Sequence, residues 1–330
     1  MNLTMNVSIQ VLAFSVTLIL ALISGPILIP VLTRLKFGQT VRDDGPATHF
    51  KKTGTPTMGG VIFLIPLLLV SVYYAFSDIR ILPLVFVTFG FGAIGFIDDF
   101  IKAVKKRKDG LYAGQKMSGL LIIAALFALY VDRYTDVGTD IIIPFLGIDA
   151  TIDLVWLFVP FTVFVLIAVT NSVNITDGLD GLAASITLVV VLFFTVAAMM
   201  RSEWDYIKVF SSIIAGGCLG FLVFNVHPAR VFMGDTGALA LGGAVGAIAV
   251  MMKMPLFIII VGAIYVIEAL SVILQVGSFK LRGKRILKMA PLHHHFELSG
   301  WKETSVVWAF LIATVICCLL GFAALRCRFF

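Results

Sequence analysis

The sequence has few charged residues and no cysteine pattern of the kind that cross-links small secreted domains. Charged residues make up 13% of the 330 residues, about half of the ~25% usual in soluble proteins. The four cysteines include no CxxC pair, so neither a disulfide framework nor a zinc site is indicated. A signal peptide has basic residues near its start, but residues 1–33 contain no Lys or Arg. We therefore expect the first apolar run to stay as a membrane span.

Apolar residues dominate instead, at 60% of the chain with a mean hydropathy of +1.05. A soluble fold would leave too much of this surface in water. Backbone in lipid must satisfy its own hydrogen bonds, so the runs predict helices, and the alternating segments of a membrane barrel are absent. The sequence predicts an all-α polytopic membrane protein with one domain over 1–330. Ten runs are long enough to cross a bilayer, at 8–32, 58–76, 81–98, 117–132, 153–171, 179–200, 207–226, 236–252, 254–277 and 304–325.

Basic residues fall mostly on one side of these predicted spans. Eighteen of the 25 Lys and Arg residues lie in one set of loops. The positive-inside rule makes that side cytoplasmic and both termini external. On the external side, residues 139–152 read as a small β-hairpin. The loops predicted to be cytoplasmic are 34–57, 99–116, 172–178, 227–235 and 278–303.

Unusual polar motifs gather on the same predicted cytoplasmic side. One interpretation makes them the walls of a single cleft; the other is that inner loops are simply polar. The motifs lie at 42–60, 98–102, 171–181, 225–235 and 290–297.

Asp98 and Asp99 end a predicted span, where a carboxylate is costly unless it is paired or bound to a cation. Two adjacent carboxylates suit Mg²⁺, which also takes phosphate oxygens and waters. The alternative is a solvated pair partly neutralised by Lys102. Asp235 starts a later span, either as the N-cap of the helix or as a third carboxylate of the same cation site.

The polar residues Asn171, Asn174 and Asp177 recur every three positions and so share one helical face. Such a stripe at a membrane edge can contact a polar ligand, and Gly178 and Gly181 permit close approach. The other interpretation is an ordinary loop, because Asp-Gly is a common turn signal.

Residues 293–295 are three consecutive histidines, and Pro291 argues against a continuous helix through them. The spacing does not suit zinc, so a phosphate-binding or proton-handling role is favoured. Glu268 is an acid inside a span, and we interpret it as a hydrogen-bonding group of the bundle interior rather than of the cleft. The basic run 280–288 fits anionic head groups, or simply the positive-inside charge.

Two glycine patterns call for structural interpretations. Residues 90–95 match GxGxxG but lie inside an apolar span without a preceding strand, so a dinucleotide site is excluded. Gly242 with Gly246, and Gly216 with Gly220, fit close packing between helices.

Four motifs together resemble the polyprenyl-phosphate N-acetylhexosamine-1-phosphate transferase superfamily. They are KxGTPTMGG at 52–60, DDxxK at 98–102, NxxNxxDGLDGLA at 171–183 and FMGD at 232–235. The sequence MAPLHHHFE at 289–297 favours the muramoyl branch of that superfamily.

The resemblance implies a ten-helix fold and a reaction. UDP-N-acetylmuramoyl-pentapeptide would give its phospho-sugar to undecaprenyl phosphate, forming lipid I for peptidoglycan synthesis and releasing UMP. It implies a Mg²⁺ cofactor, a homodimer and a multi-pass location in the bacterial plasma membrane with the site on the cytoplasmic face. Membrane lipids are expected as partners and nucleic acid is not.

The resemblance also implies roles for particular residues. Asp235 would hold Mg²⁺, and Phe232 would stack on the uracil. The catalytic group would be Asp98, Asp99, Asp235 and His293. The substrate-binding group would be Lys52, Thr57, Lys102, Asn174, Asp177, Gly178, Leu179, Asp180, Asn225, Phe232, Gln275 and His294.

Three alternatives remain at this point. A transporter would place its polar groups near the bilayer midplane in repeated halves, and no repeat is evident. A sister transferase using UDP-N-acetylglucosamine would differ in its sugar nucleotide, and a lipid-binding scaffold would not need the three aspartates. Whether an Asp forms a covalent intermediate or the lipid phosphate attacks directly is also open, with direct attack favoured because a phosphate oxyanion needs little activation.

Overall fold

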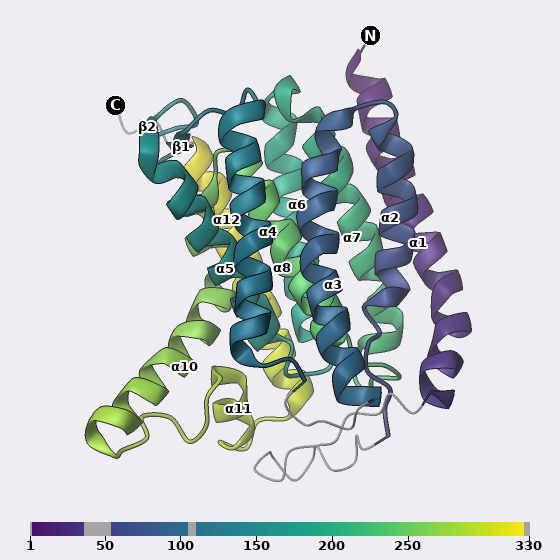
Figure 1. The fold of residues 1–330 in the computed structure, drawn as a ribbon, viewed down its shortest axis with the longest axis vertical. Helices are drawn as coiled ribbons and strands as arrows, with labels where there is room; N and C mark the ends of the chain where they lie inside the picture. Colours follow the sequence, from purple (N-terminus) through teal and green to yellow (C-terminus); the bar gives the residue numbers. More distant parts are fainter. Residues whose placement is uncertain (1, 36–53, 105–109, 327–330) are drawn as a thin grey trace.

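The computed structural model describes residues 2–35, 54–104 and 110–326, and this part of the chain is a helical bundle with one two-stranded sheet (Figure 1). Nine of its helices are long and apolar enough to cross a membrane. The all-α polytopic membrane fold is therefore confirmed. The helices are α1 (Asn2–Arg34), α2 (Val61–Ala75), α3 (Leu82–Val104), α4 (Ala113–Tyr134), α5 (Phe158–Thr176), α6 (Leu182–Ala197), α7 (Asp205–Asn225), α8 (Gly234–Met251), α9 (Ile258–Val261), α10 (Ala263–Arg282), α11 (Leu292–Glu297) and α12 (Glu303–Arg326).

Short 3₁₀ turns lead into or out of several of these helices. They are η2 (Ile79–Ile81), η3 (Val155–Leu157), η4 (Ala198–Met200), η5 (Ser202–Trp204) and η6 (Pro255–Phe257).

The predicted span at 58–76 forms a helix that is shorter than the nine long apolar helices of the described residues. Its helix, α2, has 15 residues, which gives about 22 Å at 1.5 Å per residue. That is less than the ~30 Å of a hydrocarbon core. The helix is limited by Gly59 and Gly60 before it and by the turn at Ser77 and Asp78 after it. It lies beside α1 and α7 (Figure 1).

The prediction of one continuous span at 254–277 is wrong. The chain there forms η6 and α9, and α10 begins only after Gly262, which has φ −99° and ψ 24°. Hydropathy reports which residues avoid water, but it does not report such a break, which needs a residue without a Cβ, because a Cβ at Gly262 would lie 2.8 Å from the Ile258 carbonyl oxygen. Beyond the break, α10 leans away from the rest of the bundle (Figure 1).

The centre of the bundle is α8, whose residues from Thr236 to Met251 are all buried. Its small residues let neighbouring helices approach closely. A Cβ at Gly242 would lie 2.5 Å from the Thr170 Cα of α5, and one at Gly243 would lie 2.6 Å from Phe91 of α3. The close packing predicted at Gly242 is therefore confirmed, and together with Gly243 it holds three helices together next to the site described below.

The two ends of the bundle differ, and we name them by what they carry. At the hairpin end, β1 (Asp140–Ile142) pairs antiparallel with β2 (Thr151–Asp153), so the predicted hairpin is confirmed. Helix α1 begins and α12 ends at this same end (Figure 1). The opposite end, which we call the site end, is where α3 and α5 end and where α8 begins.

Candidate active site

Three aspartates from two helices meet at the site end. Asp98 and Asp99 lie near the end of α3, and Asp235 lies in the first turn of α8. Oxygens of the three carboxylates all lie within 4.8 Å of one another. Asp98 is 2% exposed and Asp99 is 3% exposed, so this acid cluster is largely shielded from solvent. Carboxylates this close repel one another unless cations lie among them.

Two glycines allow the helices carrying these acids to touch. A Cβ at Gly95 would overlap the backbone carbonyl of Asp235. Gly234 has a φ of +72°, and a Cβ there would lie 2.5 Å from an Asp99 carboxylate oxygen. The GxGxxG sequence at 90–95 thus serves helix packing, because two of its glycines face α8. The absence of side chains at these points lets carboxylates from two helices converge.

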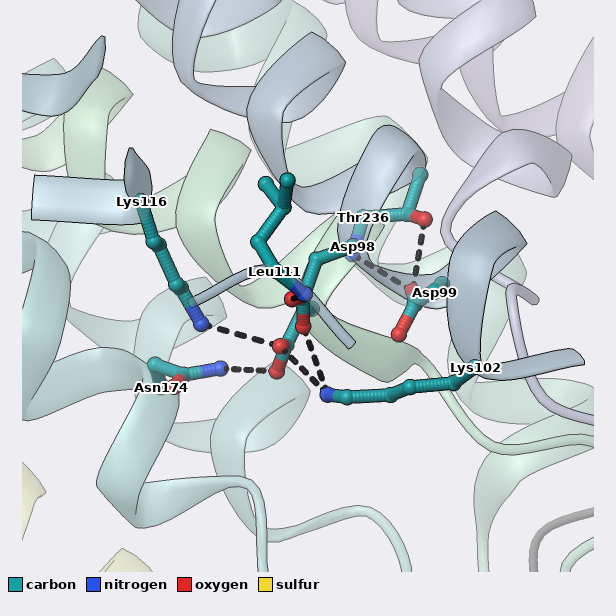
Figure 2. Close-up of polar contacts among 8 residues, drawn as sticks. Asp98, Asp99, Lys102, Leu111, Lys116, Asn174 and Thr236 are labelled. Atoms are coloured by element: carbon teal, nitrogen blue, oxygen red, sulfur yellow. Dashed lines mark hydrogen bonds and ion pairs between the residues drawn. The ribbon is translucent and has the colours of Figure 1, made fainter. Parts of the chain in front are cut away.

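Three nitrogen donors surround Asp235. Figure 2 shows the side chains that carry them, Lys102, Lys116 and Asn174, pointing toward one another. The Nζ atoms of Lys102 and Lys116 each lie 2.9 Å from its Oδ2. The amide of Asn174 donates to its Oδ1 at 2.7 Å. Lys102 also lies 2.6 Å from Asp98 Oδ2. These ammonium groups are the cations that now balance the acid cluster.

Lys116 is absent from the candidates named from the sequence, although a signal for it exists. It lies in the first turn of α4, where the helix dipole disfavours a positive charge. A lysine at that position is expected to have an anionic partner. The partner is Asp235, 119 residues later in the chain.

Asp99 is held by Thr236 rather than by a lysine. Its Oδ2 accepts hydrogen bonds from the Thr236 backbone N–H at 2.9 Å and from the Thr236 hydroxyl at 2.7 Å. Asp235 makes no capping hydrogen bond at the start of α8, where the N-cap position is Met233. The N-cap interpretation of Asp235 is therefore wrong, and its carboxylate points into the acid cluster.

The segment after Asn174 turns back beside this cluster. Asp177 follows the last residue of α5. Desolvation, together with the charges of Asp235, Asp99 and Asp180, raises the pKa of Asp177 well above its ordinary value. A carboxyl group in this position holds its proton more tightly than a free aspartic acid.

Asp180 and Asn225 hold together the loops of the site end. Asp180 Oδ2 accepts from His227 Nδ1 at 3.0 Å and from the Ala229 N–H at 3.1 Å, and its own N–H donates to Glu303 at 2.8 Å. Asn225 accepts from the Gly181 N–H and donates to the Val231 carbonyl. Both side chains are at most 5% exposed. Asp180 and Asn225 therefore each hold the backbone of the neighbouring loop in place.

A second group of possible metal-ligating atoms arises from the same loops. Asp180, His227 and Glu303 bring their ligand atoms within 4.8 Å of one another. Hydrogen bonds among these three residues, and to Ala229, already explain their arrangement as a structural junction.

The loop before α2 completes one wall of the site. The backbone N–H groups of Gly59 and Gly60 donate to the carbonyls of Phe232 and Met233 at 2.8 and 2.9 Å. Thr57 lies close to Gly234, since a Cβ there would be 2.9 Å from the Thr57 hydroxyl. Thr57 is thus beside the acid cluster, and the backbone of Phe232 is joined to the same loop. Lys52 and the residues at 42–53 lie outside the described residues.

His293 is fully buried, and a carboxylate of α10 fixes it. Its Nδ1 lies 3.1 Å from Glu268 Oε2, and its backbone N–H donates to Glu268 Oε1 at 3.1 Å. The imidazole Nε2 lies against Gly178, where a Cβ would overlap it. Leu179, the next residue, is 4% exposed. The structure thus places His293 beneath the turn that follows Asn174.

Gln275 and His294 lie farther along this wall, on α10 and α11. Gln275 accepts from the N–H groups of Ile286 and Leu287 and donates to the Leu287 carbonyl. His294 Nδ1 lies 2.9 Å from Glu297 Oε2. Gln275 thus fixes the backbone between α10 and α11.

Comparisons with known proteins show which family the chain resembles. Residues 81–253 match the family model described as glycosyl transferase family 4. Residues 52–64 match a phospho-N-acetylmuramoyl-pentapeptide-transferase signature.

Several relatives with that enzyme name match this chain over nearly their whole length. One from Acetivibrio thermocellus is 68% identical over 330 residues, covering 100% of this chain and 99% of the relative. One from Clostridium novyi is 53% identical, covering 96% and 97%. One from Thermoanaerobacter pseudethanolicus is 50% identical, covering 96% and 98%. The chain therefore belongs to the phospho-N-acetylmuramoyl-pentapeptide-transferase family.

Proposed function

We propose that this membrane protein transfers phospho-N-acetylmuramoyl-pentapeptide from its UDP conjugate to undecaprenyl phosphate, giving lipid I and UMP. The observation that carries the proposal is the acid cluster, with Lys102 and Lys116 beside it, at one end of an apolar bundle. A lipid-borne phosphate reaches such a place from the bilayer, and a water-soluble nucleotide reaches it from outside. The names of the relatives support the choice of substrates.

We propose that the acid cluster holds Mg²⁺, with Asp235 as a ligand. Oxygens of the three carboxylates lie within 4.8 Å of one another, and carboxylate oxygens are donors that Mg²⁺ prefers. Two lysine ammonium groups already lie at Asp235, so the place suits positive charge. When bound, the ion would neutralise charge on the diphosphate and stabilise the leaving UMP. Lys102 and Lys116 would then turn to phosphate oxygens.

The reaction needs positioning and charge neutralisation more than covalent help. An oxygen of the lipid phosphate forms a bond to the β-phosphorus of the UDP-sugar. The bond from that phosphorus to the bridging oxygen breaks, and its electron pair leaves with UMP. We favour this direct attack over a covalent enzyme intermediate, because the acceptor oxyanion is already a nucleophile. His293 is proposed to act near the donor, where its ring lies against Gly178.

Other residues of the site end are proposed to contact the substrates. The site end would face the cytoplasm, where the basic loops lie, and the protein would act as a homodimer. Phe232 would stack on the uracil. The remaining substrate-binding residues would be Lys52, Thr57, Lys102, Asn174, Asp177, Gly178, Leu179, Asp180, Asn225, Gln275 and His294.

The decisive experiment measures UMP release by the purified protein. We expect release only when UDP-N-acetylmuramoyl-pentapeptide, undecaprenyl phosphate and Mg²⁺ are all present. UDP-N-acetylglucosamine as the donor should give none, and activity with it instead would identify a sister transferase. UMP release without the lipid, with ping-pong kinetics, would replace direct attack by a covalent route. No release under any of these conditions would refute the proposal.

A further inference from the structure

Glu268 is a fully buried carboxylate within the membrane-spanning part of α10. The hydrogen-bond partners of its side chain among the described residues are Leu292 and His293, at the start of α11. Glu268 accepts from the backbone N–H of Leu292 at 2.9 Å and from that of His293 at 3.1 Å. Its third partner is His293 Nδ1, at 3.1 Å. Both residues are 0% exposed. A buried acid is costly unless donors surround it, and this one has three.

These contacts determine where the imidazole carries its proton. A carboxylate only accepts hydrogen bonds, so Nδ1 must donate and carries hydrogen. The other ring nitrogen, Nε2, is buried and has no partner among the described residues. A charged imidazolium would leave a buried N–H unsatisfied there, which costs more than an unshared lone pair. The geometry therefore favours the form with hydrogen on Nδ1 and the lone pair on Nε2.

The lone pair faces a segment that also reaches the acid cluster. Nε2 lies against Gly178, the residue at which any side chain would collide with the ring. Four residues earlier, Asn174 donates to Asp235 at 2.7 Å. The Nε2 atom of His293 therefore faces the short segment 174–178, whose Asn174 bonds to Asp235.

We propose that Glu268 is a positioning residue that holds His293 in the Nδ1–H form, so that Nε2 faces Gly178 as a hydrogen-bond acceptor. The role rests on the proposed transfer reaction, in which the segment from Asn174 to Gly181 contacts the donor nucleotide. At metal sites, a carboxylate that accepts a hydrogen bond from a ligating histidine orients its ring in the same way, and the loss of that carboxylate costs about 10- to 100-fold in activity or affinity.

The variant Glu268→Gln tests the polarity without changing the size of the side chain. Leu292 N–H and His293 Nδ1 both bond to Oε2, and the His293 N–H bonds to Oε1. A glutamine carbonyl in the Oε1 position turns its NH₂ group towards Nδ1, so the imidazole proton would move to Nε2 and a donor would replace the acceptor at Gly178. A carbonyl in the Oε2 position instead sets the NH₂ group against the His293 N–H, so the ring loses its fixed position in either orientation. We expect kcat/KM for the UDP donor to fall about 10- to 100-fold, with KM for the lipid phosphate unchanged.

Tyr265→Phe is the matched control, because Tyr265 is buried on the same helix three residues earlier. Its hydroxyl lies 2.7 Å from the Thr187 hydroxyl, and Thr187 keeps its bond to Ala183. The substitution removes a buried hydrogen bond of α10 without touching His293. We expect a loss of thermal stability similar to that of Glu268→Gln, with unchanged kinetics.

The spectroscopic readout is ¹⁵N NMR of the full-length protein labelled at histidine, with His293→Gln assigning the signal. In the wild-type protein we expect a protonated Nδ1 and an unprotonated Nε2 for His293, and in Glu268→Gln we expect an Nε2–H form to appear. A wild-type Nε2–H form would overturn the proposal even if Glu268→Gln failed to fold. So would Glu268→Gln kinetics equal to those of Tyr265→Phe. If the wild-type protein released no UMP, the transferase proposal would fail, while the spectrum would still decide the proton position.

Discussion

Replacing Asp235 by asparagine removes one negative charge and changes little else in shape. The side-chain carbonyl can still accept from Asn174, but the new NH₂ group would face the ammonium groups of Lys102 and Lys116, which now lie 2.9 Å from Oδ2. Two unit charges about 4 Å apart in a partly shielded site interact by about 4 kcal/mol. If the same charge holds Mg²⁺ on the diphosphate, its loss should lower kcat about a thousandfold.

The assay is UMP release from Asp235→Asn at increasing Mg²⁺ concentrations, beside folding and oligomeric state by gel filtration. We expect a folded protein with a weak response to Mg²⁺. Asp132→Asn is the control, since Asp132 also pairs with a basic side chain, Arg133 at 3.0 Å, but on α4 near the hairpin end. It should retain wild-type activity. Normal turnover and a normal Mg²⁺ response in Asp235→Asn would remove Asp235 from the metal site and refute the reasoning.

The membrane architecture could be predicted from the sequence because the bilayer imposes a simple physical condition. Apolar runs of sufficient length must be helices, and all of the predicted runs contain them. What hydropathy does not record is backbone geometry. The break at Gly262 and the shortness of α2 depend on glycines and turn residues at their ends, not on the apolar content of the runs.

The acid cluster could be suspected because carboxylates at a membrane edge need a reason to be there. Asp98 and Asp99 lie together in sequence, and Asp235 follows a distinctive motif. Lys116 was harder to assign, because the predicted span begins at 117 and leaves it in a basic loop, whereas the structure puts it in the first turn of α4. Only the packing of α4 beside α3 and α5 brings it to Asp235.

The link between Glu268 and His293 shows a second limit of sequence reasoning. Each residue was notable alone, as an acid in a span and as one of three histidines. Their contact depends on a chain reversal between α10 and α11, which Gln275 stabilises through the backbone at Ile286 and Leu287. The preference for a structural role of Glu268 was correct about its burial, yet its partner is a candidate site residue. Long-range pairing of this kind comes from tertiary packing.

Two further predictions concern charges at the site. Lys116→Met should lower kcat about 10- to 100-fold, because a hydrogen bond to a charged group contributes about 1.5–3 kcal/mol. The control Lys253→Met loses a similar ion pair, with Asp140 at 2.8 Å, and should leave kcat unchanged. Equal kcat values for the two variants would remove Lys116 from the site. Asp177→Asn tests the raised pKa of Asp177. An acid whose folded pKa is raised binds more protons when folded than when unfolded, so the wild-type protein should lose stability as pH rises from about 4 towards the raised folded value. The neutral asparagine lacks this penalty, so its thermal midpoint relative to wild type should rise with pH over that window. Parallel pH profiles of the two midpoints would show that Asp177 ionises normally in the folded protein.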